Sequence, residues 1–296
     1  MLYANDIINI FLPVLSHWII WLSFFVVVII VLFLYAYPYI KKPGKEFNSR
    51  HIGIPSANII SLYIFTKLLE GVIYQGYILK VDARINETML ALNSHWIYNV
   101  ALFITNFGGT LMITILFTSV LALLVLKKRW RYAIISTIAL LGAVVLQLGI
   151  KALVQRARPE NLIQTGFSFP SGHAITAIVF VSLLIYSFKD DFKNKIIKYV
   201  LIIIFTCFFI SVGISRIILH VHWFSDVMAG MSLGLFWFML LVLIERAIPG
   251  VVPAVKRETK EAKPIVPKVL TKTAKSIVPK TLTKKAKSKV LKKKKS

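Results

Sequence analysis

Two segments of the 296-residue chain carry residue types that can do chemistry on an anionic group. The first runs from Lys151 to His173 and reads KALVQRARPENLIQTGFSFPSGH, and the second runs from Ser215 to Asp226 and reads SRIILHVHWFSD. Both combine fixed cations with histidine, and the second adds a carboxylate four residues after His222, one helical turn further on. Ionisable groups beside long apolar runs are costly, so both segments are candidates for a functional site.

This mixture of side chains favours phosphoryl transfer. Cations and backbone N–H groups bind phosphate oxygens, one histidine attacks phosphorus, a second donates a proton, and a carboxylate orients the nucleophile. A simpler alternative is headgroup anchoring, which would explain each basic residue taken alone. Anchoring does not require two histidines and a carboxylate beside Lys151, Arg158 and Arg216, so the catalytic interpretation is favoured.

The elements that must position these residues are membrane helices. The chain is 57% hydrophobic and only 16% charged, whereas a soluble domain carries roughly 25% charged residues. We therefore expect an all-α, polytopic membrane helix bundle, in which each span takes about 20 apolar residues. Gly108-Gly109 separates one span from a segment, 94–107, that is predicted to be an interfacial or re-entrant helix. The seven candidate spans lie at roughly 16–38, 56–79, 109–126, 132–150, 171–188, 197–214 and 224–247.

Loop charges predict the orientation, because Lys and Arg favour the cytoplasmic side of a membrane. The N-terminus, an 80–93 loop and both candidate segments fall on the other side, which predicts a multi-pass plasma membrane protein with its N-terminus outside, its C-terminus cytoplasmic and its site extracytoplasmic. In a seven-span chain the basic C-terminal segment shares one side with three basic loops, which contain Lys41, Lys42, Lys45, Arg50, Lys127, Lys128, Arg129, Arg131, Lys189, Lys193, Lys195 and Lys198.

Three parts are predicted: an extra N-terminal transmembrane helix with a basic loop (1–49), a six-helix core (50–248) and a Lys-rich tail (249–296). The tail holds 16 of the 36 basic residues and repeats IVPKVLTKTAKS as IVPKTLTKKAKS. Such a stretch cannot bury enough apolar surface to fold alone, and we expect it to contact anionic lipid headgroups. Nucleic acid is not an expected partner, because the tail has no aromatic residue to stack on bases.

Three motifs carry a family resemblance. In chain order they are K-x6-R-P, P-S-G-H and S-R-x5-H-x3-D, which begin at Lys151, Pro170 and Ser215. Together they resemble the signature of the type 2 phosphatidic acid phosphatases, membrane lipid phosphate phosphatases that share a fold with the vanadium haloperoxidases. The resemblance covers about residues 50–248, and it covers neither the first helix nor the tail.

The resemblance implies a role for each motif residue. His222 would be the nucleophile that forms a phosphohistidine, Asp226 would orient its imidazole, and His173 would protonate the departing lipid oxygen. Neither a metal nor another cofactor is expected. Fixed cations, a hydroxyl group and a backbone N–H would hold the phosphate, supplied by Lys151, Arg158, Arg216, Ser171 and Gly172.

The resemblance also implies hydrolysis of a lipid phosphate or diphosphate. Undecaprenyl diphosphate is the first expectation, followed by phosphatidylglycerophosphate and phosphatidic acid. Two alternatives stay open at this point. One is a lipid phosphotransferase that uses the same phosphohistidine, and the other is a non-enzymatic membrane protein on the same frame.

Charged residues near the motifs have simpler explanations. Arg156 falls in the spacer of the first motif and is expected to contact headgroups. His220 is expected to be structural or to lie at the rim, because a separation of two residues turns it away from His222. Lys67 and Glu70 are expected to neutralise each other across i, i+3.

Overall fold

The computed structural model describes residues 2–41, 52–92, 94–159, 165–188, 190–192 and 194–247, with side chains from residue 16 onward. These residues belong to one compact unit, Met1–Val255. The tail and the basic residues Lys42, Lys45, Arg50, Lys189 and Lys193 lie outside the described residues, and the predicted part boundaries stay a prediction. Within the described ranges the chain has no strand and forms α1 Leu2–Lys41, α2 Gly53–Ile73, α3 Tyr77–Leu92, α4 His95–Phe107, α5 Thr110–Leu126, α6 Trp130–Val154, α7 Gly172–Phe188, α8 Lys195–Ile218 and α9 Phe224–Ala247.

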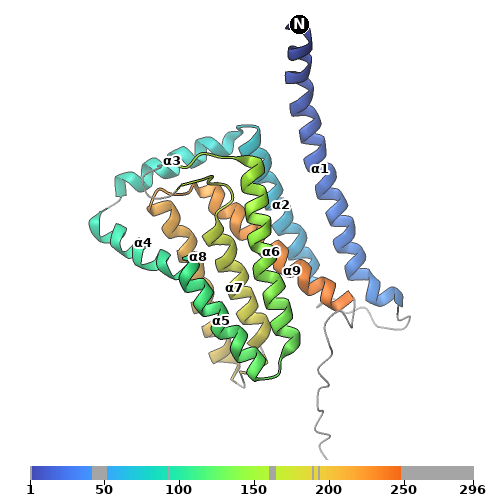
Figure 1. The fold of residues 1–296 in the computed structure, drawn as a ribbon, viewed down its shortest axis with the longest axis vertical. Helices are drawn as coiled ribbons and strands as arrows, with labels where there is room; N and C mark the ends of the chain where they lie inside the picture. The colour runs from blue at the N-terminus through green and yellow to red at the C-terminus, as the bar shows by residue number, and fades with distance from the viewer. Residues whose placement is uncertain are drawn as a thin grey trace, which may run out of the picture. The chain divides into compact units, whose positions relative to one another are not determined.

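The helices fulfil the prediction of an all-α membrane bundle (Figure 1). Five described helical segments are long and apolar enough to cross a bilayer, namely Ser16–Lys41, α2, α6, α8 and α9. The α4–α5 pair adds a sixth if it is one broken span, since the two helices are bent by 41° at the Gly108-Gly109 break. The helix α7 is apolar but shorter, at 17 residues.

The segment predicted as an 80–93 loop is instead the 16-residue helix α3. The chain leaves α2 through Gln75, which has a φ of 50°, and the N–H of Gly76 then bonds to the carbonyl of Gly71 at 2.8 Å. Figure 1 shows α3 crossing the end of the bundle instead of continuing α2. The predicted second span was therefore too long, because its last residues belong to α3.

Small residues let α7 and α9 pack closely at the centre of the bundle. A Cβ atom on Gly230 would lie 2.6 Å from the carbonyl oxygen of Ser171, and one on Gly234 would lie 2.9 Å from that of Ile175. Glycine at i and i+4 on one face is the usual way in which membrane helices bring their backbones together. The start of α7 is therefore held directly against the first turns of α9.

Polar contacts attach α1 to α2. The indole Nε1 of Trp21 donates to Glu70 Oε1 at 3.0 Å, and His17 Nδ1 lies 3.0 Å from the same oxygen. Lys67 Nζ contacts Glu70 Oε2 at 2.6 Å, which confirms the predicted pair. The same ammonium group lies 5.4 Å from the centre of the Trp21 ring. Glu70 therefore neutralises Lys67 and also anchors the extra N-terminal helix.

Two of the four basic segments predicted to share one side of the membrane, those after α5 and after α7, meet at one end of the bundle. Lys127 and Arg129, which follow α5, both pair with Asp191 in the α7–α8 connection. Arg131 at the start of α6 pairs with Glu245 near the end of α9. These contacts place four helix ends together, opposite the end where α6 passes to α7.

Candidate active site

The predicted site residues come from helix ends and connections that meet at the bundle end crossed by α3. The helices α6 and α8 end there, and α7 and α9 begin there (Figure 1). The fold brings all eight predicted residues to this end: Lys151 in α6, Arg158 in the α6–α7 connection, Ser171, Gly172 and His173 at the start of α7, Arg216 in the last turn of α8, His222 in the α8–α9 connection, and Asp226 in the first turn of α9.

His222 and Asp226 form a buried pair. The distance from His222 Nδ1 to Asp226 Oδ2 is 3.3 Å, and the two side chains are 2% and 0% exposed. A carboxylate only accepts hydrogen bonds, so a neutral imidazole here carries its proton on Nδ1 and keeps Nε2 unprotonated, as a nucleophile requires. The N–H of Trp223 donates to the same carboxylate oxygen at 3.0 Å. The start of α9 thus selects the tautomer that a nucleophilic Nε2 requires.

The surroundings of His222 keep its imidazole neutral. The pKa of His222 is lowered to about 4, chiefly by burial, with Arg216 and Arg158 acting in the same direction and Asp226 opposing them. Arg158 Nη1 lies 3.3 Å from His222 Nε2 and donates to the carbonyl of Val221 at 2.7 Å. Burial also lowers the pKa of the Arg158 guanidinium, and Asp226 opposes that shift. A neutral imidazole next to a cation fits a nucleophile that attacks an anionic phosphate.

Two predicted phosphate ligands hold buried polar atoms without a protein partner. Arg216 is 3% exposed and donates Nη1 to Thr105 Oγ1 at 2.9 Å, but its Nε and Nη2 have no hydrogen-bond partner within the described part of the chain. The Oγ of Ser171, which is 0% exposed, has none in the same ranges. Buried polar groups are normally satisfied, so these atoms are available to hydrogen-bond an anion if one binds here.

A cavity of about 340 Å³ opens beside the start of α7, at Gly172 and His173. Its polar end is formed by Lys151, Arg158, His173 and His222, and Lys151 Nζ is steadied there by the carbonyl of Phe167 at 2.5 Å. A headgroup at the polar end would have its lipid portion beside the apolar wall that α5 and α6 supply, which is made by Ile113, Leu140, Val144 and Leu148.

The prediction that Arg156 contacts headgroups is wrong, because its side chain is only 10% exposed and pairs with two buried carboxylates. It contacts Asp226 from α9 and Asp82 from α3, and Asp82 also binds Ser225. His220 is structural, as predicted, with Nδ1 2.9 Å from Asn86 Oδ1. Sequence reasoning missed Asp82 and Ser225, since Asp82 lies in no motif and Ser225 occupies a spacer position of the third motif.

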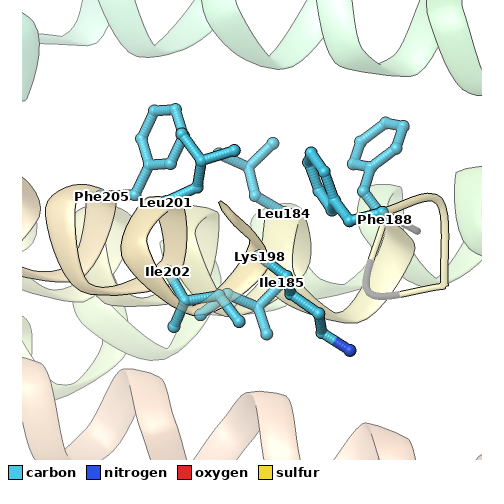
Figure 2. Close-up of a pocket in the computed structure, with 8 residues that line it drawn as sticks. Leu184, Ile185, Phe188, Lys198, Leu201, Ile202 and Phe205 are labelled. Atoms are coloured by element: carbon cyan, nitrogen blue, oxygen red, sulfur yellow. The ribbon is translucent and has the colours of Figure 1, made fainter. Parts of the chain in front are cut away.

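A second cavity, of about 130 Å³, lies between α7 and α8 and is apolar (Figure 2). It lies toward the end of α7 and the start of α8, whereas the candidate site lies at the opposite ends of the same helices. This cavity is therefore not part of the site. It is lined by Leu184, Ile185, Phe188, Phe192, Lys198, Leu201, Ile202 and Phe205.

The fold and the site together define a class: a multi-pass helical membrane protein with a buried histidine–carboxylate pair facing a cationic cavity. In the ranges that the structure describes, no group of three or more His, Cys, Asp or Glu side chains is arranged to hold a metal ion.

Comparison with known proteins gives the family: the chain belongs to the PAP2 superfamily, whose family model matches residues 131–248. It is 31% identical over 202 residues to an undecaprenyl-diphosphatase of Sulfolobus acidocaldarius, covering 64% of this chain and 88% of that protein. It is 27% identical over 194 residues to phosphatidylglycerophosphatase B of Bacillus subtilis, covering 62% and 92%. The chain is therefore a membrane lipid phosphate phosphatase, and the non-enzymatic alternative falls away.

A solved structure supports the same fold. The crystal structure of a transmembrane PAP2 type phosphatidylglycerolphosphate phosphatase from Bacillus subtilis superposes with a TM-score of 0.57 at 24% identity. The match covers 65% of this chain and 97% of that one.

Proposed function

We propose that this phosphatase hydrolyses lipid phosphates through a phosphohistidine intermediate on His222, without a metal. The observation that carries the proposal is one cavity lined by both histidines, Lys151 and Arg158. Asp226 pairs with His222, and Arg216 acts electrostatically on both histidines. Such a convergence supplies a nucleophile, an acid and charge stabilisation in one place.

In the first step, Nε2 of His222 attacks phosphorus and forms an N–P bond while the bond between phosphorus and the lipid oxygen breaks. His173 donates a proton to that departing oxygen, and Asp226 stabilises the positive charge that develops on the imidazole. In the second step, a water molecule gives its proton to His173 and its oxygen to phosphorus. The N–P bond breaks, inorganic phosphate is released, and both histidines return to their starting states.

The phosphate oxygens would be held by Lys151, Arg158 and Arg216, together with the hydroxyl of Ser171 and the N–H of Gly172. The unpartnered donors of Arg216 and the unpartnered hydroxyl of Ser171 support this assignment. The first turn of α7 adds its unsatisfied N–H groups, which favour an anion at a helix N-terminus.

Undecaprenyl diphosphate is the first substrate to test, followed by phosphatidylglycerophosphate and phosphatidic acid. The names of the two curated relatives support the first two lipids. The clustering of Lys127, Arg129 and Arg131 at the opposite end of the bundle supports an extracytoplasmic site, since basic loops favour the cytoplasm.

The test is phosphate release by the detergent-solubilised protein, in EDTA, from each of these three lipids. His222→Ala should abolish release, whereas His95→Ala, an exposed histidine on α4, should leave it unchanged. Rapid acid-free quenching with labelled substrate should trap an acid-labile phosphoenzyme in the parent protein and none in His222→Ala.

Two results would overturn the proposal. Activity of His222→Ala close to that of the parent would exclude this nucleophile, and loss of activity in EDTA that is restored by a divalent cation would exclude metal independence. A phosphorylated lipid acceptor with little free phosphate would instead support phosphotransfer.

A further inference from the structure

Arg156 is fixed by the backbone around it. The helix α6 ends at Val154, and the next residue, Gln155, turns the chain with a φ of 52°. The carbonyl of Arg156 then accepts the N–H of Ser168 at 2.8 Å. The guanidinium group lies 5.3 Å from the centre of the Trp223 ring, and the Trp223 indole donates to the carbonyl of Ala157 at 2.9 Å. The side chain is therefore held against the α8–α9 connection.

The two ends of the guanidinium group bind two different carboxylates. Nη1 donates to Asp226 Oδ1 at 2.7 Å and to Ser225 Oγ at 2.7 Å, and Nη2 donates to Asp82 Oδ2 at 2.6 Å. Asp226 thus uses Oδ1 for Arg156 and turns Oδ2 toward His222 Nδ1. A rotation of this carboxylate would break both contacts.

Asp82 completes the arrangement from α3. It is 1% exposed, and it accepts the N–H of Ser225 at 2.8 Å and the Ser225 hydroxyl at 2.5 Å. Because Asp82 neutralises Arg156 and also binds the first turn of α9, it fixes the distance between that guanidinium and Asp226. Burying two carboxylates around one cation is costly, and a purely structural core would be better served by apolar side chains.

We propose that Arg156, held by Asp82, is a positioning residue for catalysis, because it locks the Asp226 carboxylate in the orientation that aims His222 Nε2 at phosphorus. The inference rests on the proposed role of His222. Arg156 does not line the cavity, and it acts on the substrate only through Asp226 and His222.

Charge and geometry make separable contributions to this role. A lysine supplies the charge but has no planar fork with which to bridge two carboxylates. Arg156→Gln removes the positive charge, so the His222–Asp226 pair would hold a proton more tightly. Asp82→Asn leaves the positive charge of Arg156 uncompensated, so the His222–Asp226 pair would hold a proton less tightly.

The experiment measures kcat, KM and the pH dependence of kcat/KM for Arg156→Gln, Arg156→Lys and Asp82→Asn in detergent, with phosphatidylglycerophosphate as the substrate. Arg84→Gln, the same change at an exposed position of α3, is the matched control. Each variant is first checked for a single species by gel filtration and for its thermal unfolding midpoint.

We expect kcat to fall about 100-fold in Arg156→Gln, which is typical when a reacting group is displaced by about 1 Å. KM should change less than about threefold, because the phosphate-binding cations are untouched. The acidic limb of the pH profile should move up by about one unit in Arg156→Gln and down in Asp82→Asn, and it should stay near that of the parent in Arg156→Lys despite a lower kcat.

This limb reports the environment of His222 as a whole. The other charged or titratable groups that face it remain in every variant, namely Asp226 from α9, Arg216 from α8, Arg158 from the α6–α7 connection, His173 from α7 and Lys151 from α6. A shift of the limb is therefore attributable to Arg156 or Asp82. If Arg156 had only a structural role, its replacement would lower the unfolding midpoint and leave the acidic limb of the pH profile where it is in the parent.

The outcomes separate this inference from the proposed function. If His222→Ala is inactive but folded Arg156→Gln matches Arg84→Gln in kcat and pH profile, only the positioning role is refuted. If Arg156→Gln does not fold, a parent-like kcat in Arg156→Lys or an unshifted acidic limb in Asp82→Asn refutes it instead. If His222→Ala stays active, the proposed mechanism fails and this inference fails with it.

Discussion

Replacing Arg216 by methionine should make the ligand-free protein more stable and the enzyme much less active. Arg216 is 3% exposed, its Nε and Nη2 are unpartnered among the described residues, and its one side-chain bond goes to Thr105. A buried cation that lacks part of its hydrogen bonding is destabilising on its own. Its place in the bundle is therefore best explained by an anion that pairs with it during turnover.

The magnitudes follow from the two free donor atoms. If each makes one hydrogen bond to a phosphate oxygen, at about 1.5–3 kcal/mol for a charged group, the variant loses about 3–6 kcal/mol of binding in the transition state. Because about 1.4 kcal/mol corresponds to a factor of ten, kcat/KM should fall about 10²- to 10⁴-fold. Exchanging a buried charge for an apolar side chain of similar volume often stabilises by about 1–4 kcal/mol, and the lost bond to Thr105 costs about 1 kcal/mol. The free energy of unfolding should therefore rise by about 0–3 kcal/mol.

The assay pairs phosphate release with thermal unfolding followed by tryptophan fluorescence, with and without inorganic phosphate. The parent should be stabilised by phosphate, by about 2.7 kcal/mol at 100 times its Kd, and Arg216→Met should lose that response. Arg84→Met, on the exposed face of α3, should behave as the parent does in both assays. A lower unfolding midpoint combined with unchanged kcat/KM and an intact phosphate response would refute the reasoning and make Arg216 a structural residue.

Three further predictions follow from the packing, the charge of the site and the tail. Gly230→Ala should lower the unfolding midpoint and kcat/KM, because its Cβ would lie 2.6 Å from the Ser171 carbonyl oxygen and overpacking typically costs about 1–3 kcal/mol; Gly149→Ala, with nothing within 4 Å, is the neutral control. Because the pKa of His222 is lowered to about 4, the acidic limb of kcat/KM should lie well below pH 6.5. The free energy of unfolding should fall as the pH drops from 6.5 toward 4, because the unfolded chain takes up a proton there that the folded chain excludes; an acidic limb near 6.5 would contradict the burial of His222. Deletion of residues 249–296 should leave hydrolysis in detergent nearly intact and weaken binding to vesicles of anionic lipid, measured by co-sedimentation; loss of activity in detergent would contradict a separable tail.

The sequence was sufficient to predict which site residues lie together where they are close in the chain or where the number of helices between them fixes their side of the membrane. The His222–Asp226 contact spans one turn, and His173 shares a face with them because an even number of crossings separates the two segments. The break at Gly108 was also readable, since two glycines interrupt an apolar run that is too long for one span. The packing around Gly108 could not be predicted, because a Cβ on Gly108 would lie 2.2 Å from Val212, which is more than 100 positions away in the sequence.

The network around Arg156 could not be predicted from spacing. Its partners Asp82 and Asp226 lie 74 and 70 positions away, and the motif places no requirement on this residue. The helix that carries Asp82 was itself mistaken for a loop because it contains several charges. Its apolar residues nevertheless recur at helical spacing, and Ile85 and Met89 pack on a buried cluster of the bundle. That periodicity was the available signal, and it predicts a helix with one face inward but not the place of that helix across the bundle end.

The charges of the site explain why so many ionisable groups are kept beneath a membrane surface. The Asp82–Arg156–Asp226 network carries a net single negative charge, and His222 is neutral. The three cations Lys151, Arg158 and Arg216 therefore exceed it by two positive charges, not counting the proton that His173 passes to the leaving group in the proposed first step. A phosphate monoester dianion cancels that excess, whereas a phosphodiester with one negative charge leaves a cation buried and uncompensated. The same balance that orients His222 thus favours a terminal phosphate over the phosphodiesters that make up most of the surrounding lipid.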